Sequence, residues 1–315
     1  DDIFSYFNKS ASFNGEDELD QVGSCLNNLY PDSLKRAFYR DELTQKIKTL
    51  VFENKSNVSF VILGKEGVGR HSIIEESLRI YISKTVEEER DENSVQQLWQ
   101  VDPTRIISGM SVIGMWQKRF ETILNHMQKS IYNINGSLLS DKLMIDNPVA
   151  LIRIGKSSQN SMTLSDVMKP YIEDQKLQFI IISSPEEWAV IQEKDRRFAD
   201  LFRIIRVDEP AVEESLKMGL EVRKQLESEM NCRIAIPAIK FLKDIHRNYF
   251  RNKANPGFMA SIMRSIALKY RNSEIDRNEI RAEFSSISGL SSNIFDDDHF
   301  LEEDELKKSI SSSLV

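Results

Sequence analysis

Residues 58 to 80 read VSFVILGKEGVGRHSIIEESLRI. The first six are apolar apart from Ser59, which is typical of a short buried strand. Glycines follow at positions 64, 67 and 69, and the apolar side chains after them recur with helical spacing. A strand, a glycine-rich turn and a helix in this order predict a loop whose backbone wraps around a phosphate group.

The candidate phosphate-binding residues are those of the turn and the start of the helix: Gly64, Lys65, Glu66, Gly67, Val68, Gly69, Arg70 and His71. Such loops end in Lys followed by Ser or Thr, whose hydroxyl holds Mg²⁺. Here Arg70 keeps the positive charge, but the imidazole of His71 is a poor ligand for an oxygen-seeking ion. We expect the loop to cradle ATP or ADP with little support for Mg²⁺ or hydrolysis. A plain glycine-rich turn is the alternative.

The rest of the chain predicts an α/β fold followed by helices. Further strands are expected at 98–101, 149–154, 179–183 and 203–207, with helices at 112–130, 163–174 and 186–202 between them. Strands that alternate with helices predict a parallel sheet covered on both faces. From Pro210 onward strand patterns vanish, and residues 211–230, 237–250, 257–271 and 276–285 predict helices. The expected domains are a loosely ordered polar lead-in (1–32), an αβα P-loop unit (33–209), a small all-helical unit (210–286) and an acidic connecting segment (287–315).

Composition excludes several classes of function. The net charge of −7 argues against nucleic acid as a partner, and no apolar run approaches the roughly 20 residues of a membrane span. Two cysteines, Cys25 and Cys232, are consistent with a reduced cytoplasmic setting, although they could still pair. The four histidines form no cluster with metal-ligand spacing, so no metal site is expected.

Several segments, in the correct order, resemble the first ATPase domain of Clp-family AAA+ unfoldases of the ClpA, ClpB and ClpV type. They are residues 39–42 (YRDE), 108–124, 182–188 (ISSPEEW), 207–210 (VDEP), Pro256 and the tail 287–315. The resemblance implies a large αβα subdomain, a helical lid and a hexameric ring that threads protein clients. Little sequence separates the lid helices from the tail, which looks more like ClpA than ClpB.

The same resemblance places substitutions at the positions that carry catalysis. The Walker B Asp and Glu are expected after the strand at 149–152, where Arg153 and Ile154 stand, and neither can hold Mg²⁺ or polarise water. Ser183 and Ser184 correspond to the sensor that contacts nucleotide. The arginine-finger pair corresponds to Asp200 and Leu201, with Arg196 and Arg197 one helical turn earlier.

Two further family positions are altered. The pore loop that grips clients corresponds to Ser111, Val112 and Ile113, with Val112 in place of the gripping Tyr. In the lid, Phe258 stands where the family has Lys, and it can pack but cannot pair with phosphate. Nearby Met110, Met115 and Trp116 are expected to belong to the core.

Three hypotheses remain open on the sequence alone. The first is a degenerate AAA+ domain that serves ring assembly or regulation, with weak or no ATP hydrolysis. The second is a working ATPase that uses atypical residues such as Arg70, Glu66 and Arg196. The third is an interaction module, for a protein client or adaptor, that binds no nucleotide.

Overall fold

The computed structural model describes residues 13–54, 56–88, 95–110, 114–134, 137–156 and 161–289. The chain divides into two units by its internal contacts. The first takes the residues up to 65 and 70–208, and the second takes 66–69 and the residues from 209 onward. None of the described helices is long and apolar enough to cross a membrane.

The first unit is built on a six-stranded sheet in the order β1-β3-β6-β7-β2-β8. Five strands run parallel, and β1 pairs antiparallel with β3. The strands are β1 (Gly23–Cys25), β2 (Phe60–Leu63), β3 (Leu98–Val101), β6 (Lys142–Ile145), β7 (Gln178–Ser183) and β8 (Arg203–Arg206). The predicted α/β fold with a parallel sheet is therefore confirmed.

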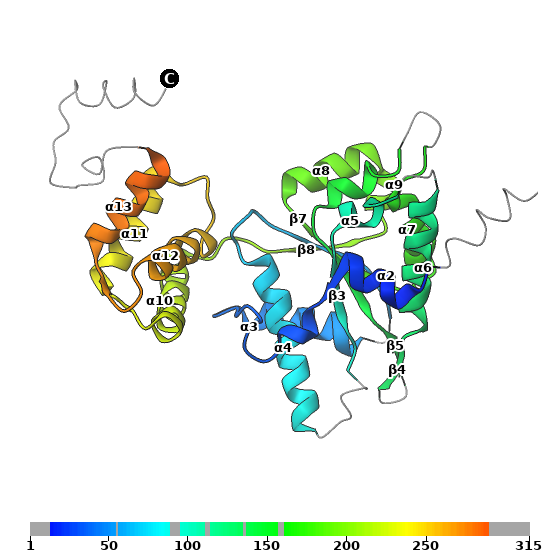
Figure 1. Ribbon diagram of the computed structural model, residues 1–315, viewed down its shortest axis with the longest axis horizontal. Coiled ribbons are helices and arrows are strands. Elements are labelled where there is room, and N and C mark those ends of the chain that lie inside the picture. Colours follow the sequence, from blue (N-terminus) through cyan, green and yellow to red (C-terminus); the bar gives the residue numbers. More distant parts are fainter. Residues whose placement is uncertain are drawn as a thin grey trace, which may run out of the picture. The chain divides into compact units, whose positions relative to one another are not determined.

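Helices cover both faces of this sheet (Figure 1). One face packs on a core shared with α6 (Met115–Lys129) and α7 (Leu164–Glu173). Side chains alternate along a strand, so the other residues of β2 and β7 face the opposite side, where α3 (Asp41–Lys48) and α4 (Arg70–Glu87) lie. The remaining elements of this unit are η2 (Thr49–Glu53), α5 (Pro103–Ile107), β4 (Ile131–Ile134), β5 (Ser137–Ser140), α8 (Pro185–Lys194) and α9 (Arg196–Ala199).

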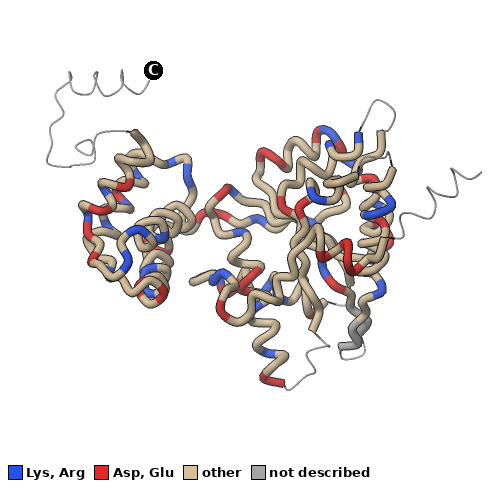
Figure 2. The backbone as a smooth tube through the Cα atoms, in the orientation of Figure 1, with Lys and Arg blue, Asp and Glu red and all other residues tan. Residues whose placement is uncertain are grey.

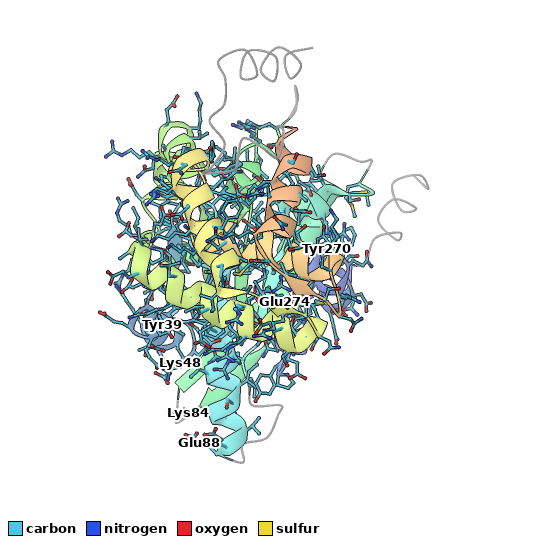
Figure 3. All side chains as sticks on the ribbon, turned by 90° about the vertical axis from the view of Figure 1, so that its left-hand side faces the viewer. Tyr39, Lys48, Lys84, Glu88, Tyr270 and Glu274 are labelled. Carbon is cyan, nitrogen blue, oxygen red and sulfur yellow. The ribbon has the colours of Figure 1, made fainter. Side chains whose placement is uncertain are left out.

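Helices α3 and α4 are tied through one carboxylate. Oε1 of Glu53, the last residue of the π-helical turn η2, lies 2.9 Å from Nζ of Lys48 and 4.0 Å from Nζ of Lys84. Both lysines are labelled in Figure 3. These two cations hold the pKa of Glu53 below its usual range, despite the opposing effect of burial.

The polar lead-in is more ordered than predicted. Helix α2 (Gly15–Val22) is capped by Asn14, and β1 and the 3₁₀ turn η1 (Leu26–Leu29) follow it. The helix forms because Leu19 and Val22 are buried against the core that contains α6. Arg119 of α6 is itself buried and bonds to Glu18 of α2, which anchors the segment.

The strand predicted at 149–154 is wrong. Residues Pro148–Ile152 form the 3₁₀ helix η4, and the strand between β3 and β7 is β6, earlier in the chain. Asn147 adopts a left-handed conformation with a φ of 59° and Pro148 opens η4, so the extended chain stops before the apolar run begins. That run is buried because η4 packs on β7 and its neighbouring helices.

The second unit contains α10 (Val212–Met230), α11 (Ile236–Tyr249), α12 (Gly257–Lys269) and α13 (Arg277–Ser288) around one apolar core. The prediction that strands vanish after Pro210 needs a correction, because β9 (Arg233–Ile234) and β10 (Glu274–Ile275) form a short parallel ladder. Basic and acidic residues are interspersed over these helices (Figure 2). Cys25 and Cys232 are free thiols.

Candidate functional site

The carboxyl ends of the parallel strands meet at one edge of the sheet, where ligands bind in folds of this type. Gly64 follows β2 there, Asp146 follows β6 and Ser184 follows β7. The N–H of Gly64 donates to the carbonyl of Ser183 at 3.2 Å, which fixes the start of the loop to the end of β7. The sequence-predicted loop and serines are thus brought to the same edge.

The loop has the backbone geometry that an anion site requires. Gly67 and Gly69 each have a φ of 92°, a conformation that side chains disfavour. In the part of the chain that the structure describes, the N–H groups of residues 65 to 69 donate no backbone hydrogen bond. Such unpaired donors in a glycine loop ahead of an 18-residue helix fit a phosphate group.

Residues 66–69 belong by their contacts to the helical unit. The N–H of Gly257, the first residue of α12, donates to the carbonyl of Gly67 at 2.8 Å. A Cβ on Gly257 would lie 2.5 Å from the Cα of Gly67, so the two backbones touch. This approach depends on glycine at both positions.

His71 and Asp146 form the central contact of the site. Nε2 of His71 lies 2.9 Å from Oδ2 of Asp146, and the N–H of Asn147 donates to Oδ1 of the same carboxylate at 3.1 Å. The hydrogen bond with His71, together with the charges of His71 and Arg70, holds the pKa of Asp146 below its usual range. Both carboxylate oxygens therefore already have partners within the protein.

Asp146 is a candidate site residue that the sequence analysis did not single out. It directly follows the buried strand β6, the position at which the Walker B Asp is expected in this type of sheet, and Asn147 follows it. The assignment of this element to Arg153 and Ile154 is wrong, because both follow the 3₁₀ helix η4. The available signal was the short apolar run of residues 143–145 that ends in Asp.

A polar cavity of about 530 Å³ adjoins this pair. Its lining residues come from the amino-terminal cover, β3, α5, the end of β6 and α8: Val22, Ser24, Gln100, Val101, Asp102, Arg105, Asp146, Asn147 and Glu187. Asp146 and Asn147 thus border open space on the side of β3 and α5, and the residues of the loop 64–71 are not part of this lining.

Comparison with known proteins gives the fold and the relatives. No protein-family model matches the chain. It is 26% identical over 232 residues to the chaperone protein ClpB of Agrobacterium fabrum, covering 73% of this chain and 25% of that protein. ClpB of Mycoplasmoides gallisepticum is 25% identical over 83% of this chain, and heat shock protein 100 of Trypanosoma brucei brucei is 26% identical over 69%. The chain is a Clp-family AAA+ domain.

Solved structures agree with this assignment at the level of the fold. Hsp104 with ATPγS and FITC-casein superposes with a TM-score of 0.69 at 17% identity, covering 92% of this domain and 48% of that chain. The Saccharomyces cerevisiae Hsp104–ADP complex gives a TM-score of 0.67 at 17% identity, with 94% and 49% covered. The Clp-family domain spans about a quarter to a third of the length of the curated relatives named above.

The two sensor-like serines of the Clp-family domain are both engaged. Ser183 is fully buried and its hydroxyl donates to the carbonyl of Ser184 at 3.0 Å. The hydroxyl of Ser184 accepts the N–H of Glu187, whose carboxylate accepts the N–H of Ser184 in return. This reciprocal cap starts helix α8.

The candidate arginines of the Clp-family domain differ in whether they form ion pairs with other residues. Arg70 is half-buried, and its guanidinium forms no ion pair or hydrogen bond with any described residue, so it remains available to a phosphate. Arg197 donates to Glu173 at 2.9 Å. Arg196 is 85% exposed and lies 3.7 Å from Asp200.

The other family positions are structural or lie outside the described residues. Phe258, at the position that corresponds to the family's Lys, packs in an aromatic group with His246, Phe250 and Phe284. Trp116 is buried in the core, as predicted. The pore-loop-like Ser111, Val112 and Ile113 lie outside the described residues.

Proposed function

We propose that this chain is a degenerate Clp-family domain that serves ring assembly or regulation, with weak or no ATP hydrolysis of its own. The observation that supports this most strongly is the contact between His71 and Asp146 at 2.9 Å. In P-loop ATPases these two positions hold a hydroxyl and a carboxylate that share Mg²⁺. Here they bind each other.

The second support is the chemistry of Asn147. An amide cannot accept a proton from the attacking water, whereas the family Glu in this place can. The retained Asp146 therefore lacks both its partner for the metal and its neighbour for water activation. Phosphoryl transfer depends on positioning and charge stabilisation, so the combined losses lower the rate by many orders of magnitude.

Nucleotide binding is a separate property, and the loop supports it. The unpaired N–H groups of residues 65 to 69 and the free guanidinium of Arg70 suit the phosphates of ATP or ADP. We place the nucleotide at residues 64–71. Ser183 and Ser184 occupy the sensor-like position, where their hydroxyls are engaged within the protein, and the pore-loop role falls on residues 111–113 as part of the same proposal.

The proposed assembly is a hexameric ring in a longer, cytoplasmic protein that also carries an active second ATPase domain. The clients would be proteins, as in the Hsp104 structure that contains FITC-casein. The domain limits at 33–209, 210–286 and 287–315 belong to this proposal. The second hypothesis, a working ATPase with atypical residues, is favoured by the retention of Asp146 and by the free Arg70.

Phosphate release from ATP with MgCl₂ separates these functions. We expect the chain to release phosphate no faster than its Arg70→Ala variant, while Arg264→Ala, an exposed arginine of the helical unit, serves as the matched control. Arg70→Ala should also weaken ADP binding by about tenfold to a hundredfold, because a hydrogen bond to a charged group contributes about 1.5–3 kcal/mol. Turnover that Arg70→Ala abolishes would establish the working ATPase instead.

A further inference from the structure

The family implies Mg²⁺ between the loop helix and the strand that carries the Walker B Asp, and the residues of this chain do not fit that ion. Mg²⁺ requires oxygen ligands in near-octahedral geometry and commonly uses one or two carboxylates with water and phosphate. The hydroxyl ligand is replaced by the imidazole of His71. Asp146 is the one family ligand left among the described residues of this site.

The remaining carboxylate is already satisfied. Oδ2 of Asp146 pairs with His71, and Oδ1 accepts the N–H of Asn147. A cation at Oδ2 would compete with the imidazole for this oxygen, and it would lie near the positive charge of Arg70, which already acts on this carboxylate. The protein thus stabilises the charge of Asp146 with its own groups.

The charge of a phosphate group can instead be met by Arg70 and the loop backbone. Arg70 directly precedes His71 at the start of α4, and no acidic residue occupies the first turn of that helix. The guanidinium has five N–H donors in a fork that matches phosphate oxygens, and the loop adds its unpaired backbone N–H groups. These groups supply the positive potential that a metal supplies elsewhere.

We propose that this loop binds the phosphates of a nucleoside di- or triphosphate without a divalent cation, and that the His71–Asp146 pair closes the metal position. The proposal rests on the nucleotide-binding part of the proposed function. It makes His71 the residue that determines metal dependence. Replacing it with the family's hydroxyl residue should free Asp146 and reopen the metal position.

The test is calorimetric titration of the chain with ADP in MgCl₂ and in EDTA. We expect wild-type ADP binding to be no tighter in MgCl₂ than in EDTA, since the protein gains no contact with the metal and Mg²⁺ in solution competes for the phosphates of ADP. His71→Thr should bind ADP at least about tenfold more tightly in MgCl₂ than in EDTA, the scale on which ligand changes act at metal sites. His126→Thr, the same replacement on α6, is the matched control and should behave as wild type.

Mn²⁺ provides a readout that does not depend on affinity. In the presence of ADP, electron paramagnetic resonance should detect protein-bound Mn²⁺ with His71→Thr and none with wild type. A tenfold loss of wild-type ADP binding in EDTA, bound Mn²⁺ in wild type, or unchanged metal dependence in His71→Thr would overturn the proposal. No ADP binding in either buffer would also overturn the metal-free nucleotide site, but it would leave the proposed role as an inactive assembly domain intact. Phosphate release from ATP would refute that inactive role and not the proposal about the metal.

Discussion

Lys142, at the start of β6, is a charge buried in the core of the sheet. It is 1% exposed, and burial lowers its pKa from 10.5 to about 8. Its amine donates to Oδ1 of Asn57 at 2.9 Å. The pKa is about 2.5 below the ordinary value, which at 1.36 kcal/mol per pH unit makes the buried ammonium cost about 3 kcal/mol at pH 7.

Lys142→Met removes this cost and keeps most of the volume of the side chain. Losing the hydrogen bond to Asn57 lowers the free energy of unfolding by about 1 kcal/mol, so we expect the variant to be about 2 kcal/mol more stable than wild type at pH 7. For a unit of this size each kcal/mol corresponds to about 2–4 °C in Tm. The gain should depend on pH in a defined direction.

Below pH 8 the lysine is protonated in both the folded and the unfolded state, so the full cost is present. Between about 8 and 10.5 the unfolded chain binds the proton and the folded chain does not, so the stability of wild type rises with pH. The advantage of Lys142→Met should therefore be complete at pH 7 and shrink across this window.

Urea denaturation of both proteins at pH 7 and pH 10 measures the difference. Lys46→Met, an exposed lysine of α3, is the control and should change stability by less than about 0.5 kcal/mol at either pH. A Lys142→Met variant that is less stable than wild type at pH 7, or whose advantage is the same at both pH values, would refute the argument from burial.

Two further changes test the amino-terminal cover and the cap of α8. Glu18→Gln should destabilise the first unit by about 3 kcal/mol in urea denaturation, because Arg119 is left as a buried charge without its partner. Adding Arg119→Met should recover much of this loss. A change in stability below about 0.5 kcal/mol for Glu18→Gln would contradict the prediction. Ser184→Ala should cost about 1 kcal/mol by removing the helix cap and leave ADP affinity unchanged, since its hydroxyl is engaged by Glu187, whereas a tenfold weaker affinity would identify Ser184 as a working sensor.

The parts of the fold that sequence predicted best are those with local signals. The strand, loop and helix around Gly64 lie within a few residues of their predicted limits, because an apolar run, glycines and helical spacing all occur within 25 residues. Helix α2 was missed because only Leu19 and Val22 of its eight residues are large and apolar, and it owes its order to burial on α6. Long-range contact decided that element.

The candidate site shows the same limit. The inability of His71 to hold Mg²⁺ was predictable from its side chain, but its partner was not. The partner of His71 is Asp146, whose position depends on β6 lying beside β7. The charged Lys142 at the first position of β6 made this strand difficult to recognise from the sequence. Residues 143–145 and 149–152 are both short apolar runs that could form this strand. The left-handed conformation of Asn147 and the start of η4 at Pro148 end the strand after the first run.

The glycine pair at Gly67 and Gly257 affects how mutants of the loop should be read. Any residue with a Cβ at position 67 would place that atom 2.6 Å from the carbonyl oxygen of Ala254, so the first damage would fall on the packing of the helical unit. A weakened ligand response in such a mutant would then report a lid defect rather than a lost phosphate contact. Gly69, where an added Cβ meets nothing within 4 Å, has the same positive φ and would separate backbone strain from steric collision.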